Sequence, residues 1–214
     1  MMISTNFAVS NIKFENNEII LDKELSNLDS SVIEFSDILN RNNIRHVLIS
    51  GYIPILFGKE GEIEYIDILI QNISFEKFLK LWLEIENSYE CKNASDPIDA
   101  YNAYLKNYHS VSISKKGSNC PYFNLKIIKD EIERYVLKYR RIARIGGDHL
   151  YIPPIEMQIS QNLSTGNEKE INEARFLYTL FKEKLDKALM DRYLKELNIP
   201  DESVETYLFG RLSK

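Results

Sequence analysis

The stretch "IRHVLISGYIPILFGKEGEIEYIDILIQ", residues 44–71, constrains the fold more than any other part of the chain. Its first run, "IRHVLIS", is short and rich in β-branched and aliphatic residues, a pattern that predicts a buried strand. Gly51 interrupts the run, and "YIPILFG" predicts a short helix, because Pro54 is tolerated only in the first turn of a helix. "IEYIDILIQ" predicts a second strand. We therefore expect a tight turn and a short helix between two buried strands.

Further helices and strands are predicted on both sides of this unit. "NFAVSNIKFENNEIIL" is typical of a hairpin that turns at Asn16-Asn17, and "LDSSVIEFSDILNRNN" predicts a helix with Asp29 or Ser30 as its cap. After the unit, "SFEKFLKLWLEIENS" predicts an amphipathic helix capped by Ser74. Its expected core-facing stripe is Phe75, Phe78, Leu79, Trp82 and Leu83.

The remaining elements suggest two regions. "DPIDAYNAYLKNY" and "DEIERYVLKYR" predict helices, "HSVSIS" and "YFNLKIIK" predict strands, and "RIARIGGDHLYI" predicts a hairpin turning at residues 146–148. Four helices then follow Pro153-Pro154 in succession. We predict an α/β (α+β) fold in which residues 1–152, including the N-terminal hairpin, form a mixed sheet flanked by helices. Residues 153–214 form a helical region packed on that core.

Charge and hydropathy narrow the classes of function. The 214 residues carry a formal net charge of −5, which argues against a basic coat for nucleic acid but leaves a local basic face open. No apolar run approaches the roughly 18 residues of a membrane span. The opening "MMISTNFAVSNIKFENNEII" has no basic start and no continuous apolar run, unlike a signal peptide. We expect a cytoplasmic protein without a membrane partner.

Two ordered blocks of the sequence resemble the nucleotidyltransferase superfamily, whose fold is shared with DNA polymerase beta. "FSDILNRNNIRHVLISGYIPILFG" matches the family's helix, strand, Ser-Gly or Gly-Ser turn and short helix ending in Gly. "YIPPIEMQISQNLSTGNEKEINEARFLYTLF" is similar to its later helices, "P-x-E-x-x-I-x-x-K-L" and then "G-S-x-K-D-x-x-D-A". The likeness runs from roughly Leu28 to Leu185 and is strongest to the minimal nucleotidyltransferase-like proteins, which include toxin and antitoxin relatives.

The resemblance implies a chemistry that depends on paired carboxylates. Such enzymes transfer a nucleotidyl group from a triphosphate, with two divalent ions held between acidic side chains. The family's "R-x-T-x-D-hydrophobic-D" strand places both acids on one face, since residues two apart on a strand point the same way. A third acid comes from a neighbouring strand. One carboxylate alone holds Mg²⁺ poorly, because that ion requires near-octahedral oxygen coordination.

This sequence departs from the pattern at several of those positions. Aligning "FGKEGEIEYIDILI" with the strand puts Tyr65 at the first Asp and Asp67 at the second, with Gly61 and Ile63 at the Arg and Thr. The third acid position falls on Asn124 or Lys126 of "YFNLKIIK". In the helical block, the departures are Asn162 for Lys, Glu170 for Asp, and Asn172-Glu173 in the second acidic pattern.

The candidate site is therefore reduced to a few residues. Asp67 is the retained carboxylate of the motif, and it is therefore the candidate catalytic residue and metal ligand. The alternative is that Asp67 pairs with Lys126, which would neutralise its charge. Ser50 and Gly51 are candidates to cradle a phosphate, or are a turn kept for packing. Glu64 is one residue out of phase with Asp67, so a regular strand would point it to the opposite face.

Three hypotheses follow. The first is an inactive nucleotidyltransferase-fold protein that binds a nucleotide or a protein partner. The second is an active transferase of the toxin-antitoxin or RNA- or protein-modifying type, which would need Mg²⁺, a nucleoside triphosphate and Asp67 assisted by Glu62 or Glu64. The third is a nucleic-acid-binding module, although its cationic run crosses a helix-to-strand boundary, which favours a scattered, solvated set. That set is Arg134, Lys138, Arg140, Arg141 and Arg144, with Tyr135 and Tyr139 between them.

Two other polar residues are expected to be structural. His46 lies in an apolar strand and is predicted to sit at the edge of the core. Glu156 occupies the family's "P-x-E" position and is expected to anchor the helical region, for instance against an arginine.

Overall fold

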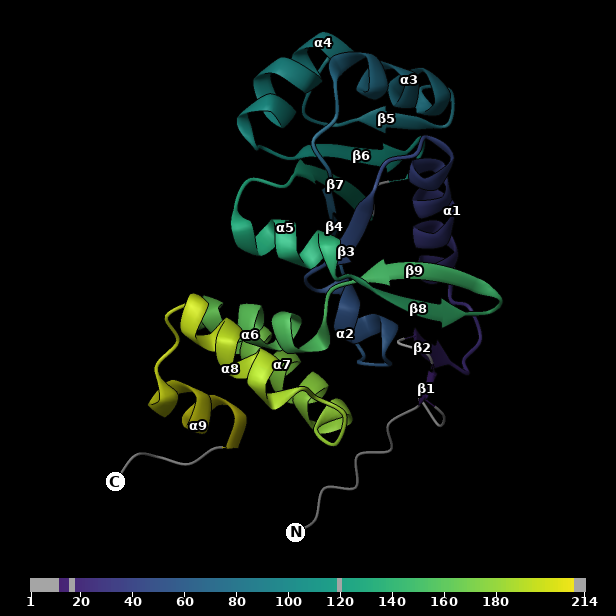
Figure 1. Ribbon diagram of the computed structural model, residues 1–214. Coiled ribbons are helices and arrows are strands. Elements are labelled where there is room, and N and C mark those ends of the chain that lie inside the picture. The colour runs from purple at the N-terminus through teal and green to yellow at the C-terminus, as the bar shows by residue number, and fades with distance from the viewer. Residues whose placement is uncertain (1–11, 16–17, 119–120, 210–214) are drawn as a thin grey trace.

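A computed structural model describes residues 12–15, 18–118 and 121–209 of the chain (Figure 1). The larger of its two sheets has five strands in the order β3-β4-β7-β6-β5, and it is mixed because β4 and β7 run parallel while the other neighbours are antiparallel. The strands are β3 (His46–Ile49), β4 (Tyr65–Ile70), β5 (Tyr89–Cys91), β6 (Val111–Lys115) and β7 (Tyr122–Ile127). β5 was not predicted, since three residues show no alternation.

The smaller sheet joins the N-terminal hairpin to the end of the α/β region. Its order is β1-β2-β8-β9, with β2 and β8 parallel. The predicted hairpin is formed by the antiparallel pair β1 and β2, but its turn at residues 16–17 lies outside the described residues. Gly146 and Gly147 turn the second hairpin with φ of 60° and 93°, values that favour glycine. The strands are β1 (Ile12–Glu15), β2 (Glu18–Leu21), β8 (Arg141–Ile145) and β9 (Asp148–Ile152).

Helices α1 (Asn27–Arg41), α2 (Tyr52–Leu56) and α3 (Phe75–Ile85) form where the apolar periodicity predicted them. Two details differ. The cap of α1 is Ser26, not Asp29 or Ser30; the Asp29 carboxylate instead accepts a hydrogen bond from the Ser26 backbone N–H and completes a capping box. Ser74 caps α3 as expected, but Leu83 is 55% exposed, because the buried side of α3 is Phe78, Leu81 and Ile85.

The segment predicted as one helix after Asp96 consists of three short pieces. Asp96 caps the first of them. The pieces are α4 (Pro97–Asp99), a π-helical turn η1 (Ala100–Tyr104) and a 3₁₀ turn η2 (Leu105–Asn107). Changes of helical pitch of this kind prevent a regular amphipathic stripe.

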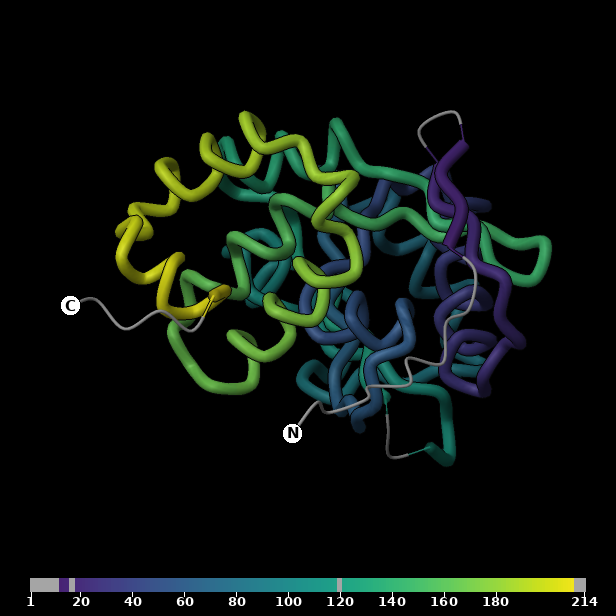
Figure 2. Tube along the Cα trace, turned by 90° about the horizontal axis from the view of Figure 1, so that it is seen from below, coloured from purple at the N-terminus to yellow at the C-terminus, as the bar shows by residue number. Residues whose placement is uncertain are grey.

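The C-terminal region is helical, as predicted. Figure 2 shows it gathered on one side of the molecule, away from α1. After α5 (Glu131–Lys138) and the smaller sheet come α6 (Ile155–Thr165), α7 (Glu168–Phe181), α8 (Lys187–Glu196) and α9 (Asp201–Phe209). Residues of α6, α7 and α8 contribute to the same hydrophobic cluster as α1 and the strands. The division at residues 152 and 153 stays a prediction.

The two faces of the five-stranded sheet differ in composition. What we call the apolar face carries Ile66, Ile68 and Ile70 of β4 and Phe123, Leu125 and Ile127 of β7, all packed with residues of α1, α2 and α3. What we call the mixed face carries the alternate residues. There Leu69 is buried against α5, α6 and α8, whereas Tyr65, Asp67, Asn124 and Lys126 keep some exposure to solvent.

The fold class is thus a mixed α+β fold with flanking helices and a C-terminal helical region, as the resemblance implied. Among the described residues, no helix combines the length and the apolar character needed to cross a bilayer.

Candidate functional site

Asp67 lies in a row of polar side chains that crosses three strands on the mixed face. Asp67 pairs with Asn124 in the register of β4 and β7, and Ser112 of β6 pairs with Asn124 from the other side. The Asn124 Nδ2 donates to Asp67 Oδ1 at 3.1 Å, and the Ser112 hydroxyl donates to Asn124 Oδ1 at 2.7 Å. The third-acid position is therefore occupied by an amide whose donor points at the one retained carboxylate.

Tyr65 starts β4 in the place of the first Asp of the motif. Its register partner on β7 is Tyr122, and the two ring centroids lie 5.6 Å apart with an interplanar angle of 32°. Tyr65 remains 44% exposed. An aromatic pair thus occupies the mouth of the region where the family places carboxylates.

The expected pairing of Asp67 with Lys126 is wrong. The Lys126 Nζ lies 2.8 Å from Glu133 Oε1 at the start of α5. Lys126 is in register with Leu69, two residues beyond Asp67 along the strand, so its ammonium extends toward α5 instead. Among the described residues, Asp67 accepts a hydrogen bond from an amide N–H and forms no ion pair with a cation.

Glu62 and Glu64 do not complete a metal site. Both are exposed and precede β4, whose pairing with β7 is regular from Tyr65 onward and contains no bulge. Within the described ranges, no group of three or more His, Cys, Asp or Glu side chains is arranged to hold a metal ion. A pair of divalent ions needs several converging oxygens, whereas this position offers one carboxylate, one amide donor and two tyrosine rings. The residues present therefore do not fit that metal pair.

The turn formed by Ser50 and Gly51 connects β3 to α2. Ser50 has φ of 64°, in the left-handed region that non-glycine residues rarely occupy. Its backbone N–H donates to Gln158 Oε1 of α6 at 3.2 Å. A Cβ added at Gly51 would lie 3.5 Å from Ile63 Cδ1, an ordinary contact, so packing there does not demand a glycine. The N–H at the centre of the expected phosphate cradle already has a side-chain acceptor.

A chain of buried polar side chains continues from this turn into the helical region. Gln158 Nε2 donates to Asn162 Oδ1 at 2.8 Å, and Asn162 Nδ2 donates to Glu173 Oε2 at 3.4 Å. All three residues are 3% exposed. Burial raises the pKa of the Glu173 carboxyl, an effect that Lys169 and Lys59 partly oppose. Asn162, where the family has Lys, thus serves as a neutral link between two helices.

Gln158 was missed by the sequence analysis. Its local signal is its spacing from Asn162, four residues apart on one face of α6. Nothing local links it to Ser50, which precedes it by 108 positions.

A cleft of about 390 Å³ opens beside the turn, between α5, α6 and the mixed face; we call it the α5–α6 cleft. It begins at Ser50 and at Ile49, the register partner of Asp67 on β3. Apolar and polar residues line it in equal number, and its charged residues are Lys126, Lys129, Asp130 and Glu133. The complete lining is Ile49, Ser50, Leu69, Lys126, Lys129, Asp130, Ile132, Glu133, Val136, Pro153, Met157, Gln158, Gln161 and Leu197.

The five cations of the nucleic-acid hypothesis do not gather on one surface. Arg134 pairs with Glu131 on α5, and Arg144 pairs with Glu18 of β2. Arg140 is half-buried, with its guanidinium 4.3 Å from the centroid of the Tyr151 ring. Lys138 lies on α5 and Arg141 starts β8. The expected scattering across the helix-to-strand boundary is confirmed.

Both polar residues expected to be structural are buried. His46 Nδ1 lies 3.1 Å from the Ile44 carbonyl oxygen and donates to it, and burial lowers the pKa of the ring to about 4. Glu156 does anchor the helical region, but its partner is the backbone N–H of Asp186, which donates to Oε1 at 2.8 Å, and not an arginine. Asp186 is the N-cap of α8, so the carboxylate holds the start of that helix.

The chain was compared with protein families, curated proteins and solved structures. No family model matches the chain, and no curated protein matches its sequence. An antigenic nucleotidyltransferase-like protein from Paracoccidioides brasiliensis is similar in structure, with 13% identity, a TM-score of 0.48, and coverage of 86% of this chain and 93% of that one. The structure of ANT(2")-Ia in complex with adenylyl-2"-tobramycin gives 12% identity and a TM-score of 0.47, covering 78% of this chain and 98% of that one.

A third similar structure is the Thermotoga maritima CCA-adding enzyme complexed with tRNA. Identity is 9% and the TM-score is 0.38, over 90% of this chain and 55% of that one, so this chain spans about half of that enzyme's length.

Proposed function

We propose that the chain is a nucleotidyltransferase-fold protein that has lost metal-dependent transfer and binds a nucleotide in the α5–α6 cleft. The observation that carries the proposal is the hydrogen bond from Asn124 Nδ2 to Asp67 Oδ1, held in place by Ser112. An amide donor aimed at the carboxylate occupies the direction from which a cation would approach. Two of the family's three acid positions are moreover filled by neutral side chains.

The α5–α6 cleft supports the binding part of the proposal. Its volume of about 390 Å³ lies within the range of small-molecule sites, and such sites combine apolar walls with a few polar groups. Leu69, Val136 and Met157 offer a surface for a base, and the ammonium group of Lys129 offers charge to a phosphate, since that of Lys126 is already paired with Glu133. A concave site of this size favours a small ligand over a protein partner.

The absence of transfer and the presence of binding need separate tests. For transfer, the protein is incubated with labelled nucleoside triphosphates, Mg²⁺ or Mn²⁺, and RNA or protein acceptors, and we expect no incorporation. Incorporation that Asp67→Asn abolishes would show an active transferase and overturn that half of the proposal.

For binding, calorimetric titration with nucleoside mono-, di- and triphosphates is carried out in EDTA and again in Mg²⁺. We expect saturable binding whose affinity does not depend on the divalent ion. Lys129→Gln should weaken it about tenfold, the value of a charge-assisted contact, while Lys138→Gln, on α5 but outside the cleft, should not. Failure of every nucleotide to bind would refute the cleft as a nucleotide site.

A further inference from the structure

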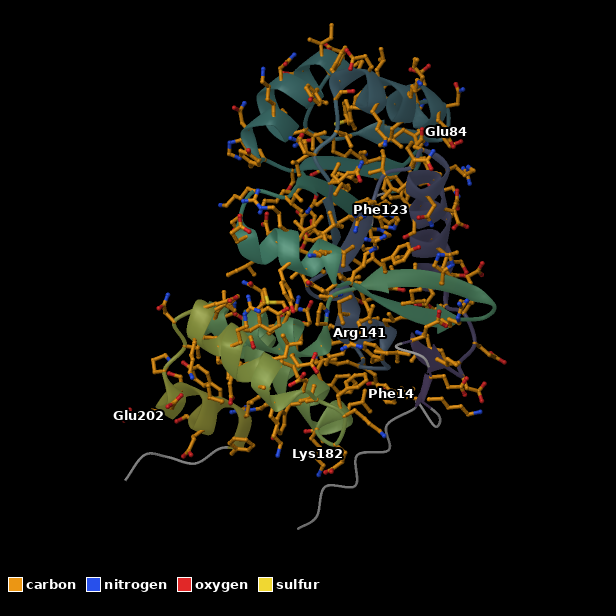
Figure 3. All side chains as sticks on the ribbon, in the orientation of Figure 1. Phe14, Glu84, Phe123, Arg141, Lys182 and Glu202 are labelled. Atoms are coloured by element: carbon orange, nitrogen blue, oxygen red, sulfur yellow. The ribbon has the colours of Figure 1, made fainter. Side chains whose placement is uncertain are left out.

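A second cavity lies where the N-terminal hairpin, β8 and the ends of α6 and α7 meet. It has a volume of about 270 Å³ and shares no lining residue with the α5–α6 cleft. Figure 3 shows Arg141 and Phe14, two of the residues that line it, toward the same end of the molecule. We call it the hairpin cavity.

Glu156 supplies the hairpin cavity with an unsatisfied acceptor. Glu156 lines this cavity and is 3% exposed. Its Oε1 accepts the Asp186 N–H, but its Oε2 has no hydrogen-bond partner among the described residues. Leaving a buried carboxylate oxygen without a donor is costly, so a donor brought by a ligand would be bound favourably.

Two cations line the same cavity without an acidic partner. No described carboxylate forms an ion pair with Arg141 or with Lys184, whereas Glu18, which also lines the cavity, is already paired with Arg144. The Lys184 Nζ instead lies 5.8 Å from the centroid of the Phe14 ring. The hairpin cavity thus presents one buried carboxylate oxygen without a donor and two cations without a described acidic partner, with Glu15 as a further, exposed carboxylate in its lining.

Apart from Glu15 and Glu18, the rest of the lining is apolar. Phe14 and Phe181 meet edge to face, with ring centroids 5.7 Å apart, and Phe14 is 41% exposed. The volume is less than twice that of a cavity of about 150 Å³ that accommodates benzene. A ligand of roughly the size of one free amino acid would fill it.

We propose that the hairpin cavity binds a small zwitterion of the free amino-acid type. The ammonium group donates to Glu156 Oε2, the carboxylate accepts from Arg141 and Lys184, and an apolar side chain packs against Phe14 and Phe181. Opposite charges on one small ligand satisfy both sets of groups at once, which an amine or a carboxylic acid alone does not.

The test uses the standard L-amino acids, titrated singly against the full chain and followed by saturation-transfer NMR. Two half-ligands accompany them: 2-phenylethylamine, which has only the ammonium, and 3-phenylpropionate, which has only the carboxylate. We expect at least one amino acid to bind saturably and more tightly than either half-ligand.

Variants assign each charge to its end of the ligand. Glu156→Gln keeps an acceptor for the Asp186 N–H but places an amide donor in the cavity. The variant should therefore bind the amino acid and the amine about tenfold more weakly and bind 3-phenylpropionate with unchanged affinity. Arg141→Gln should weaken the binding of the amino acid and of 3-phenylpropionate and leave the binding of the amine unchanged. Lys182→Gln, an exposed lysine near the cavity but not in its lining, is the matched control and should change nothing.

Three results would overturn the proposal. One is the lack of saturable binding by any amino acid up to about 10 mM, a limit that already includes weak ligands. Another is binding that neither Glu156→Gln nor Arg141→Gln weakens in folded protein, as judged by circular dichroism. The third is a half-ligand that binds as tightly as the best amino acid, which would make the site one for a singly charged molecule.

Discussion

The apolar and mixed faces of the five-stranded sheet are built from alternate residues of the same strands, yet they serve different purposes. On β7, Phe123 is 2% exposed and stacks on Phe35 of α1, with centroids 4.2 Å apart and an interplanar angle of 6°. Its neighbours Tyr122 and Asn124 point to the other face and remain partly exposed. The apolar face packs against the helices, and the mixed face carries the residues that differ from the motif of the nucleotidyltransferase superfamily, which the sequence resembles.

This contrast accounts for the loss of a metal site that we propose. Replacing a carboxylate at a partly exposed position removes little buried apolar area, so the free energy of unfolding changes little. A change on the apolar face would create a cavity and destabilise the whole sheet. The architecture therefore constrains the apolar face strongly and the mixed face weakly.

The largest expected effect compares adjacent residues of β7. Phe123→Ala should lower the free energy of unfolding by about 3–5 kcal/mol, because it removes a buried ring from a close-packed layer. Tyr122→Ala should lower it by about 1 kcal/mol or less. Urea unfolding followed by circular dichroism measures both, and equal losses from the two variants would show that the faces do not differ as described.

The next effect concerns His46, a titratable side chain among the apolar strands. Burial, with a smaller contribution from the positive charges of Arg140 and His149, lowers the pKa of its ring from 6.5 to about 4. The unfolded chain therefore takes up a proton below pH 6.5 that the folded chain refuses until about pH 4, so the stabilisation present above pH 6.5 is lost as the pH falls.

His46→Gln removes this pH dependence. Between pH 7.5 and pH 5, the free energy of unfolding should fall by about 2 kcal/mol less in the variant than in the natural chain. His109→Gln, at an exposed histidine, is the matched control. Parallel pH profiles for the natural chain and His46→Gln would refute the buried, neutral imidazole.

The sequence predicts the apolar face better than the mixed face, for a physical reason. Strand alternation and helical periodicity are local, so β4, β7 and α3 could be placed from their own residues. The Ser26 cap was also available locally, since Ser26 and Asp29 have capping-box spacing. The contact between Gln158 and Ser50 joins residues 108 positions apart. Lys126 pairs with Glu133 and not with Asp67 because of where α5 lies. Such contacts follow from tertiary structure.

A smaller effect is expected from restoring the family's acids on the mixed face. Tyr65→Asp combined with Asn124→Asp would place three carboxylates at positions 65, 67 and 124, all on one face of adjacent parallel strands. Their mutual repulsion should lower the free energy of unfolding without metal, and millimolar Mn²⁺ should restore about 1–2 kcal/mol by binding the folded state. The natural chain should show no stabilisation by Mn²⁺. Thermal unfolding with and without the ion measures this, and an unresponsive double variant would mean that the backbone no longer supports the metal geometry.

The smallest expected effect tests, in that double variant, whether the side chains at positions 64 and 67 of the chain point to opposite faces of the sheet. Adding Asp67→Asn should abolish the stabilisation by Mn²⁺, because position 67 neighbours both restored acids, position 65 along β4 and position 124 across on β7. Adding Glu64→Gln should leave it unchanged within about 0.3 kcal/mol, since Glu64 precedes a strand that is regular from Tyr65 and points away from the row. If Glu64→Gln weakened the response to Mn²⁺ as much as Asp67→Asn, the strand would have to rearrange on binding the ion. Glu64 would then count among the residues from which a metal site could be rebuilt, and the separation between the two faces would no longer hold at that end of the sheet.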